Sequence, residues 1–173
     1  MKEYTRKNSL RLQGYDYSRA GTYFLTICTH SGEMMFGEIK SGQMVLNEYG
    51  VIVQTILGRT NQVYSDLTLD AFVVMPNHIH TLVGVKDRTS AQWAAEDENV
   101  RAAEGSRPYN AVTATFIRTF KTLATKELGF SLWQRSYYDN IVHDDEEYVV
   151  IKRYIASNPI TWEKDRFYCT QHL

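Results

Sequence analysis

The distribution of hydrophobic and polar residues along the chain predicts alternating strands and helices. Runs rich in β-branched and aromatic residues, typical of strands, occupy residues 22–29, 67–75 and 78–85. Residues 36–47 have the pattern of a hairpin that turns at Lys40-Ser41-Gly42. The runs 67–75 and 78–85 are separated only by Pro76-Asn77, so we expect a second antiparallel hairpin, central to the sheet.

Helical spacing begins after Asn47, a residue suited to cap a helix, and recurs in two later segments. Residues 111–129 form a strongly amphipathic pattern that ends at Gly129. An aromatic strand is predicted at 131–142, followed by a last helix over 143–159 that Asp144 caps.

The resulting order is β, ββ, α, ββ, α, β, α, which predicts an α+β fold with an antiparallel sheet. We expect the helices to pack on one face of that sheet. Neither an internal repeat nor a domain boundary is visible, so residues 1–173 are predicted to form a single domain.

Charge changes this picture only locally. The 173 residues carry a formal net charge of -1, so a nucleic-acid partner would need local basic patches. Residues 1–20 are predicted to be a basic N-terminal arm, and the aperiodic, polar segment 86–110 a surface insertion. Cys28 and Cys169 lack CxxC spacing, and no segment is apolar enough to span or enter a membrane. We therefore expect a cytoplasmic protein without a membrane partner.

The stretch "VVMPNHIH" contains the first candidate chemistry, His78 and His80. Strand residues two apart point to the same face, with Cα atoms about 6.5 Å apart at a rise of about 3.3 Å per residue. Both imidazoles can therefore converge on one metal ion or phosphate, while Ile79 faces the core. Two polar residues on a wet sheet face would show the same spacing, so this alternative stays open.

The last helix contains a second group of candidates. Tyr154 and Asn158 are four residues apart and therefore lie on one helix face, with Lys152 and Arg153 beside them. A tyrosine at helical spacing is usually a core residue, and an asparagine before a proline commonly ends a helix. Only in combination with the histidines do Tyr154 and Asn158 become candidates for a functional site.

Four blocks in order, "GYDYSRAGTYFLTICTH", "VVMPNHIHTLV", "LWQRSYYDNIV" and "YIASNP", resemble the REP-associated tyrosine transposases. These proteins belong to the single-tyrosine HUH nucleases, and the resemblance covers about residues 12–162. It implies a ferredoxin-like fold with a catalytic helix near the C-terminus. It also implies that Tyr154 is the nucleophile and that His78, His80 and Asn158 bind the metal.

The resemblance further implies the reaction and its partners. Such enzymes cleave and rejoin single-stranded DNA near hairpins through a 5′-phosphotyrosine, with Mg²⁺ or Mn²⁺ as cofactor. Imidazole ligands would also accept Zn²⁺ or Ni²⁺. Related insertion-sequence proteins are dimers and the REP-associated group includes monomers, so a homodimer stays open.

Six basic residues are candidates for DNA contacts, although for each of them alone a solvated face is the simpler interpretation: Arg11, Arg118, Lys121, Arg135, Lys152 and Arg153. Trp133, near Arg135, could stack on an unpaired base or pack in the core.

Three functions are compatible with these residues. The first is a metal-dependent single-strand DNA transposase or endonuclease. The second is a DNA-hairpin-binding module of the same fold with little or no cleavage activity. An unrelated metal hydrolase comes last, because it does not account for the Tyr154 segment.

Overall fold

The computed structural model describes residues 20–86 and 112–168. The predicted arm (1–20) and insertion (86–110) lie outside the described residues, apart from residues 20 and 86. Arg11 also lies outside them. Within the described ranges, none of the helices has the length and hydrophobicity required to cross a bilayer.

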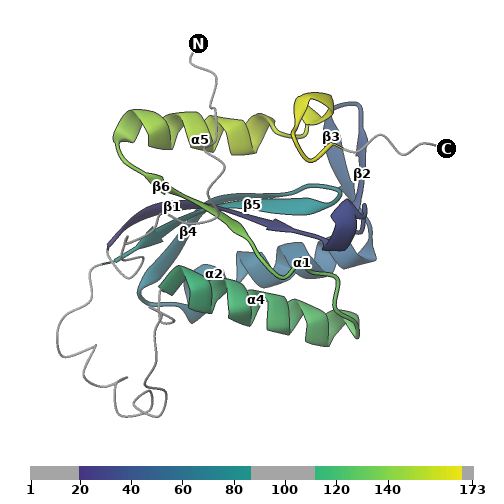
Figure 1. Ribbon diagram of the computed structural model, residues 1–173, viewed down its shortest axis with the longest axis horizontal. Coiled ribbons are helices and arrows are strands. Elements are labelled where there is room, and N and C mark those ends of the chain that lie inside the picture. Colours follow the sequence, from purple (N-terminus) through teal and green to yellow (C-terminus); the bar gives the residue numbers. More distant parts are fainter. Residues whose placement is uncertain (1–19, 87–111, 169–173) are drawn as a thin grey trace.

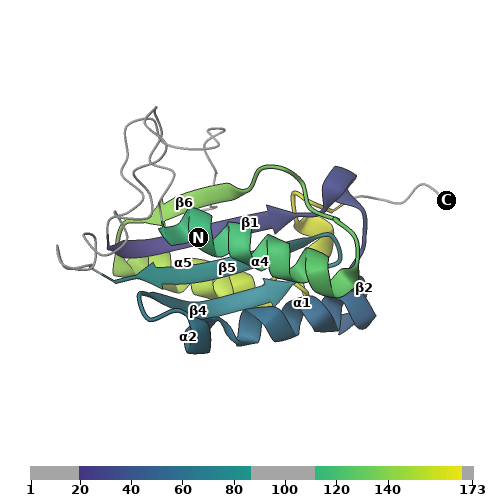
Figure 2. The same cartoon turned by 90° about the horizontal axis from the view of Figure 1, so that it is seen from below.

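The main sheet has four antiparallel strands, β1 (Gly21–Cys28), β4 (Leu67–Val74), β5 (His78–Val85) and β6 (Tyr138–Val142). They lie side by side in the order β4-β5-β1-β6 (Figure 2). Numbered along the chain, these strands have the order 2-3-1-4, which is the arrangement of a ferredoxin-like sheet. The α+β prediction is therefore confirmed.

Helices cover both faces of the sheet (Figure 1). One face carries α1 (Glu48–Gly58), the short α2 (Thr60–Val63) and α4 (Val112–Leu128), while α5 (Asp145–Ser157) crosses the other face. The prediction that all helices pack on one face is wrong. Strands β1 and β5 are buried almost throughout, as expected of strands that are covered on both faces.

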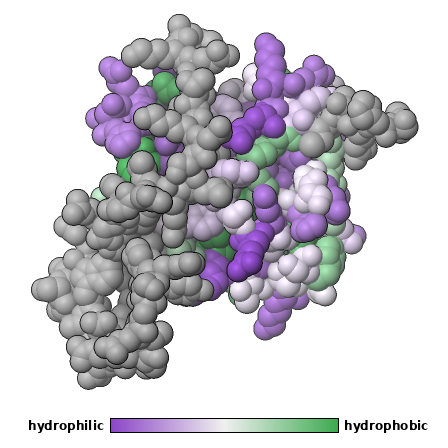
Figure 3. Space-filling model, in the orientation of Figure 1, coloured by the Kyte–Doolittle hydropathy of each residue, from purple (hydrophilic) through white to green (hydrophobic). Residues whose placement is uncertain are grey.

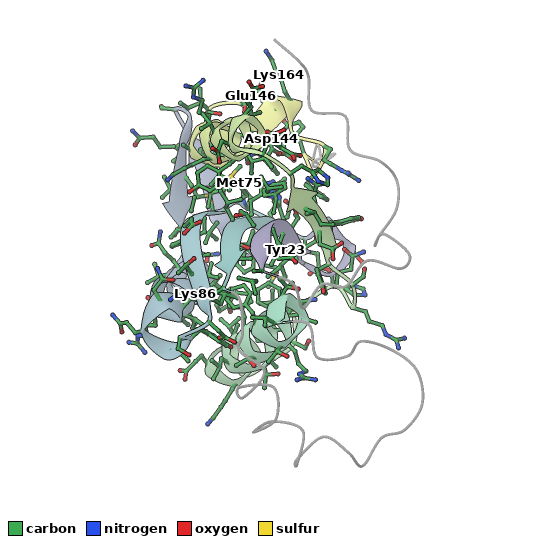
Figure 4. All side chains as sticks on the ribbon, turned by 90° about the vertical axis from the view of Figure 1, so that its left-hand side faces the viewer. Tyr23, Met75, Lys86, Asp144, Glu146 and Lys164 are labelled. Carbon is green, nitrogen blue, oxygen red and sulfur yellow. The ribbon has the colours of Figure 1, made fainter. Side chains whose placement is uncertain are left out.

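Side chains of β1 alternate between two apolar clusters. Tyr23, Leu25 and Ile27 join the large core beneath α1 and α4. Phe24 packs on the opposite side with Ile151 and other residues of α5. Figure 4 shows this layering, with Tyr23 in the sheet and Asp144 and Glu146 in the α5 layer.

The local signals that begin and end helices work as predicted. The side chain of Asn47 accepts a hydrogen bond from the Gly50 amide, and that of Asp144 accepts one from the Glu147 amide. Gly129 adopts φ +81° after the last residue of α4, a conformation that favours glycine. These caps fix where α1, α4 and α5 begin or end.

Two further expectations need correction. The hairpin of β4 and β5 forms as predicted, but only β5 is central, because β4 lies at the edge of the sheet. The strand predicted at 131–142 is ordered as β6 only from Tyr138, and an isolated bridge joins Trp133 to Thr29. The Trp133 ring packs against Phe36 and Phe120 in the core, so core packing is the correct one of its two interpretations.

A separate hairpin, β2 (Gly37–Lys40) and β3 (Gln43–Leu46), follows the 3₁₀ helix η1 (His30–Gly32). Its turn at Gly42 lies against Ile160, just beyond α5. After α5 the chain forms the 3₁₀ helix η2 (Trp162–Lys164) and then returns toward the start of β5. That return brings C-terminal residues to the two histidines.

Candidate active site

The two histidines open β5 and point toward α5. His78 and His80 are 0% and 1% exposed, which excludes the alternative of two polar residues on a wet face. Their Nε2 atoms are 3.0 Å apart, while Ile79 faces the large core as predicted. The distance is close to that between neighbouring ligands of an octahedral ion with bonds of about 2.1 Å.

Asn77 determines which nitrogen of His78 faces the site. The Asn77 amide nitrogen donates to the carbonyl oxygens of Gly32 and Phe167, so its Oδ1 is directed at His78 Nδ1, 2.9 Å away. Because that oxygen can only accept, His78 carries its proton on Nδ1. Burial and the nearby His80 lower the pKa of His78 well below its ordinary value. The ring is therefore neutral, with the Nε2 lone pair directed into the site.

His80 is held from the neighbouring strand. Its Nδ1 lies 2.9 Å from the Thr26 hydroxyl of β1, and its Nε2 faces both His78 and Tyr154. The ring also lies 5.0 Å from that of Phe24, measured between centroids. A hydroxyl can accept from Nδ1–H, and in that tautomer Nε2 of His80 carries the lone pair of a second ligand.

Tyr154 of α5 meets His80, and Asn158 joins the same group through Asp165. The Tyr154 hydroxyl lies 3.3 Å from His80 Nε2 and donates to Asp165 Oδ2 at 2.8 Å. One turn later, the buried Asn158 amide donates to the same carboxylate oxygen at 2.7 Å. Its Oδ1 has no hydrogen-bond partner among the described residues, an arrangement that is costly unless a ligand completes it.

Asp165 is the site residue that sequence analysis missed. It follows η2 in a polar C-terminal stretch without periodicity, and no motif singles it out. Burial alone would raise the pKa of Asp165, but contacts with His80, His78, the Phe167 amide and Asn158 outweigh burial and hold that pKa well below its usual range. The side chain is therefore a carboxylate at neutral pH.

These donors suit a divalent cation. Ligand atoms of His78, His80 and Asp165 lie within 4.8 Å of one another, and the unpaired Oδ1 of Asn158 adds a neutral oxygen donor. Two imidazoles, a carboxylate and an amide oxygen fit Mn²⁺ well, and the oxygen donors also suit Mg²⁺. The residues present therefore fit the metal that the family resemblance implies, with Asp165 as an additional candidate ligand.

Replacing Asn77 with alanine should weaken metal binding by about 10- to 100-fold, the usual cost of losing a group that orients a histidine ligand. Without the Asn77 oxygen, the Nδ1 proton of His78 loses its acceptor, and both the ring orientation and the tautomer are released. Isothermal titration with Mn²⁺ measures this change. Asn61→Ala is a matched control, because Asn61 also bonds to backbone atoms but lies away from the site. Unchanged affinity in Asn77→Ala would contradict this role.

Acid should destabilise the metal-free protein in two stages. Below about pH 6.5 the unfolded chain protonates His78 while the folded protein, with its lowered His78 pKa, does not. Below about pH 4 the same applies to Asp165, whose folded pKa is also lowered. The free energy of unfolding should therefore fall from pH 7.5 to 5.5 and again toward pH 3.

Urea denaturation in EDTA at these three pH values tests the prediction. The variant His78→Gln should lose part of the dependence between pH 7.5 and 5.5, whereas the exposed His143→Gln should keep it. An equal dependence in all three proteins would show that His78 does not contribute.

The predicted DNA-contact residues separate into two groups. Lys152 and Arg153 are exposed on α5 beside Tyr154, along an edge of the molecule that is largely hydrophilic (Figure 3). Arg118 and Lys121 belong to α4 on the other face of the sheet, and Arg135 is exposed in the segment after α4. The Lys121 ammonium donates to the carbonyl oxygens of Gln134 and Ser136, and burial lowers its pKa to about 8. Lys121 therefore holds this segment in place.

A ferredoxin-like sheet with an H-x-H pair beneath a helix tyrosine defines the class of single-tyrosine transposases, and comparisons with known proteins agree. Residues 42–158 match the family model described as "Transposase IS200 like". The chain belongs to this family, which confirms the resemblance found in the sequence.

Two relatives extend the comparison over most of the chain. An uncharacterized protein of Haemophilus influenzae (strain Rd KW20) is 33% identical over 168 residues, 94% of this chain and 93% of that protein. The REP-associated tyrosine transposase, solved bound to a REP hairpin, superposes with a TM-score of 0.53 at 18% identity. That match covers 94% of this chain and 74% of the solved chain, and it shows a common fold.

Proposed function

We propose that the protein is a metal-dependent transposase that cleaves and rejoins single-stranded DNA near hairpins through Tyr154. The observation that carries the proposal is the position of the Tyr154 hydroxyl, 3.3 Å from His80 Nε2 and next to the buried pair of histidines. A nucleophile and the ligands of a Lewis acid are thereby within reach of a single phosphate. The hairpin bound to the solved structural relative supports DNA as the partner. A cytoplasmic location is part of this proposal.

The chemistry is a transesterification. The Tyr154 oxygen attacks a backbone phosphorus and forms a P–O bond, while the bond from phosphorus to the 3′-oxygen breaks. The phosphate stays on the 5′ side as a phosphotyrosine, and the 3′-oxygen leaves as a hydroxyl with the proton that the phenol loses. A second 3′-hydroxyl can reverse the step, so rejoining requires no external energy source.

The residues around Tyr154 have separate roles in this scheme. We assign His78, His80, Asn158 and Asp165 to metal binding, and the bound ion would stabilise negative charge on the phosphate oxygens. Asp165 also accepts the hydrogen bond of the phenol and so aims its oxygen. Its lowered pKa makes Asp165 a weak acceptor for the proton itself, so its role toward Tyr154 is positioning.

We assign the DNA contacts from the positions of the basic residues in the fold. Lys152 and Arg153 share α5 with Tyr154, so we propose that they bind the phosphates that flank the cleaved one. Arg118 and Arg135 would reach only DNA that extends around the edge of the sheet.

A denaturing gel tests the proposal. The protein is incubated with single-stranded DNA carrying the palindromes found beside its gene, with Mn²⁺, Mg²⁺ or EDTA. A slow-migrating, protease-sensitive band that requires the metal supports the transposase. Hairpin binding without such a band under any condition would favour a DNA-hairpin-binding module instead.

A further inference from the structure

A stack of two aromatic rings and a guanidinium lies beside the candidate active site. The guanidinium carbon of Arg166 is 5.2 Å from the ring centroid of Tyr138 and 5.0 Å from that of Phe167. The two rings are 5.8 Å apart and inclined by 51°. Both aromatic residues are half-buried and Arg166 is exposed, so the stack is accessible from solvent. We refer to Tyr138, Arg166 and Phe167 as the aromatic stack.

The aromatic stack lies directly against the two histidines. The Phe167 ring lies 4.7 Å from the His78 ring and 6.2 Å from the His80 ring, between centroids. Tyr138 pairs in the sheet with Thr26, whose hydroxyl contacts His80. Any phosphate held by the histidines would therefore have this stack as an immediate neighbour.

Backbone contacts hold Phe167 in place from both sides. Its carbonyl oxygen accepts from the Asn77 amide at 2.8 Å, and its amide donates to Asp165 Oδ1 at 2.7 Å. Both partners belong to the candidate active site. With its backbone fixed in this way and its ring packed against both histidines, Phe167 loses little conformational entropy when a ligand binds to it.

We propose that the aromatic stack binds the unpaired nucleobase next to the phosphate that Tyr154 attacks. Aromatic faces and arginine guanidinium planes are the two surfaces on which unpaired bases stack in proteins that bind single-stranded DNA. The net charge of the chain is -1, so stacking adds affinity that bulk charge does not provide. The inference rests on the proposed function, because that function supplies the reacting phosphate.

Binding of DNA with single missing bases tests the inference. Fluorescence anisotropy measures the affinity of metal-free protein in EDTA for the hairpin DNA, with an abasic site placed in turn at each unpaired position beside the hairpin. We expect one position at which the abasic site weakens binding about tenfold. In Tyr138→Leu that position-specific loss should disappear, because the ring that stacks on the base is gone.

Conservative variants separate stacking from folding. Tyr138→Phe retains the ring and should keep the abasic effect, and Arg166→Gln should reduce it by removing the guanidinium plane. A thermal melt of each variant verifies the fold. A Tyr138→Leu protein that is folded and still shows the full abasic effect would overturn the inference, as would the lack of any abasic effect in the unmodified protein.

The adduct assay distinguishes this inference from the proposed function. If the adduct forms but no abasic effect depends on Tyr138, the nuclease stands and the stacking site is wrong. If the effect depends on Tyr138 but no adduct forms, the stack binds a base and the cleavage function is wrong. Mapping the cleaved bond gives a last check. The unpaired position whose abasic effect depends on Tyr138 should lie next to that bond, and a position remote from it would contradict the assignment.

Discussion

The variant Tyr154→Phe should reduce formation of the covalent DNA adduct by at least about a thousandfold, to below detection on a gel. The substitution removes only the hydroxyl that donates to Asp165 and that we propose as the nucleophile. The ring, which packs edge-on against Phe24 at 6.0 Å, should keep its place, so hairpin binding should change little. Denaturing gels measure the adduct, and anisotropy measures the binding.

Tyr148→Phe provides a matched control on the same helix. Tyr148 packs against the same small cluster, but its hydroxyl lies 3.4 Å from the Lys152 ammonium. Its loss should leave the rate of adduct formation within about twofold, because the hydroxyl contacts Lys152 at the proposed flanking-phosphate position rather than the groups around the reacting phosphate. An adduct that persists in Tyr154→Phe and vanishes in Tyr148→Phe would move the nucleophile to Tyr148.

The second large effect is expected from the histidines. His80→Ala should slow adduct formation by about a hundredfold or more, equivalent to about 3 kcal/mol of lost stabilisation of the reacting phosphate. His80 is a proposed metal ligand and also faces the Tyr154 hydroxyl, so its removal should affect both halves of the site. Affinity for Mn²⁺, measured by titration calorimetry, should fall together with the rate.

Two further variants make this prediction specific. His78→Ala should show a similar loss of metal affinity, because its Nε2 faces the same point. The exposed His30, in η1, is the control, and His30→Ala should match the unmodified protein in both measurements. Adduct formation that keeps its full rate and metal requirement in His80→Ala would exclude these histidines as the metal site.

Much of the fold was predictable because its signals are local. Caps such as Asn47 and Asp144 act within one helical turn, and Gly129 permits a backbone conformation that other residues disfavour. The period of two in β5 also correctly predicted that His78 and His80 share a face and that Ile79 enters the core. Each of these predictions depends on residues within a few positions of one another.

The errors concern relations between distant segments. We expected every helix on one face, although the nearly continuous apolar run of β1 already indicated two covered faces. It interpreted Asn77 only as a break between strands, whereas its amide orients the His78 ring. The hydrogen bonds that fix Asn77 reach Gly32 and Phe167, 45 and 90 residues away.

The sequence by itself therefore determined the elements, the histidine pair and the tyrosine helix, because periodicity and capping are short-range properties of the chain. Only the tertiary structure decided how the site is completed. It brings Asp165 from beyond α5 to Tyr154 and Asn158, and among the described residues it leaves the buried Asn158 Oδ1 without a hydrogen-bond partner. Such contacts arise when packing closes long loops, and no local pattern around Asp165 records them.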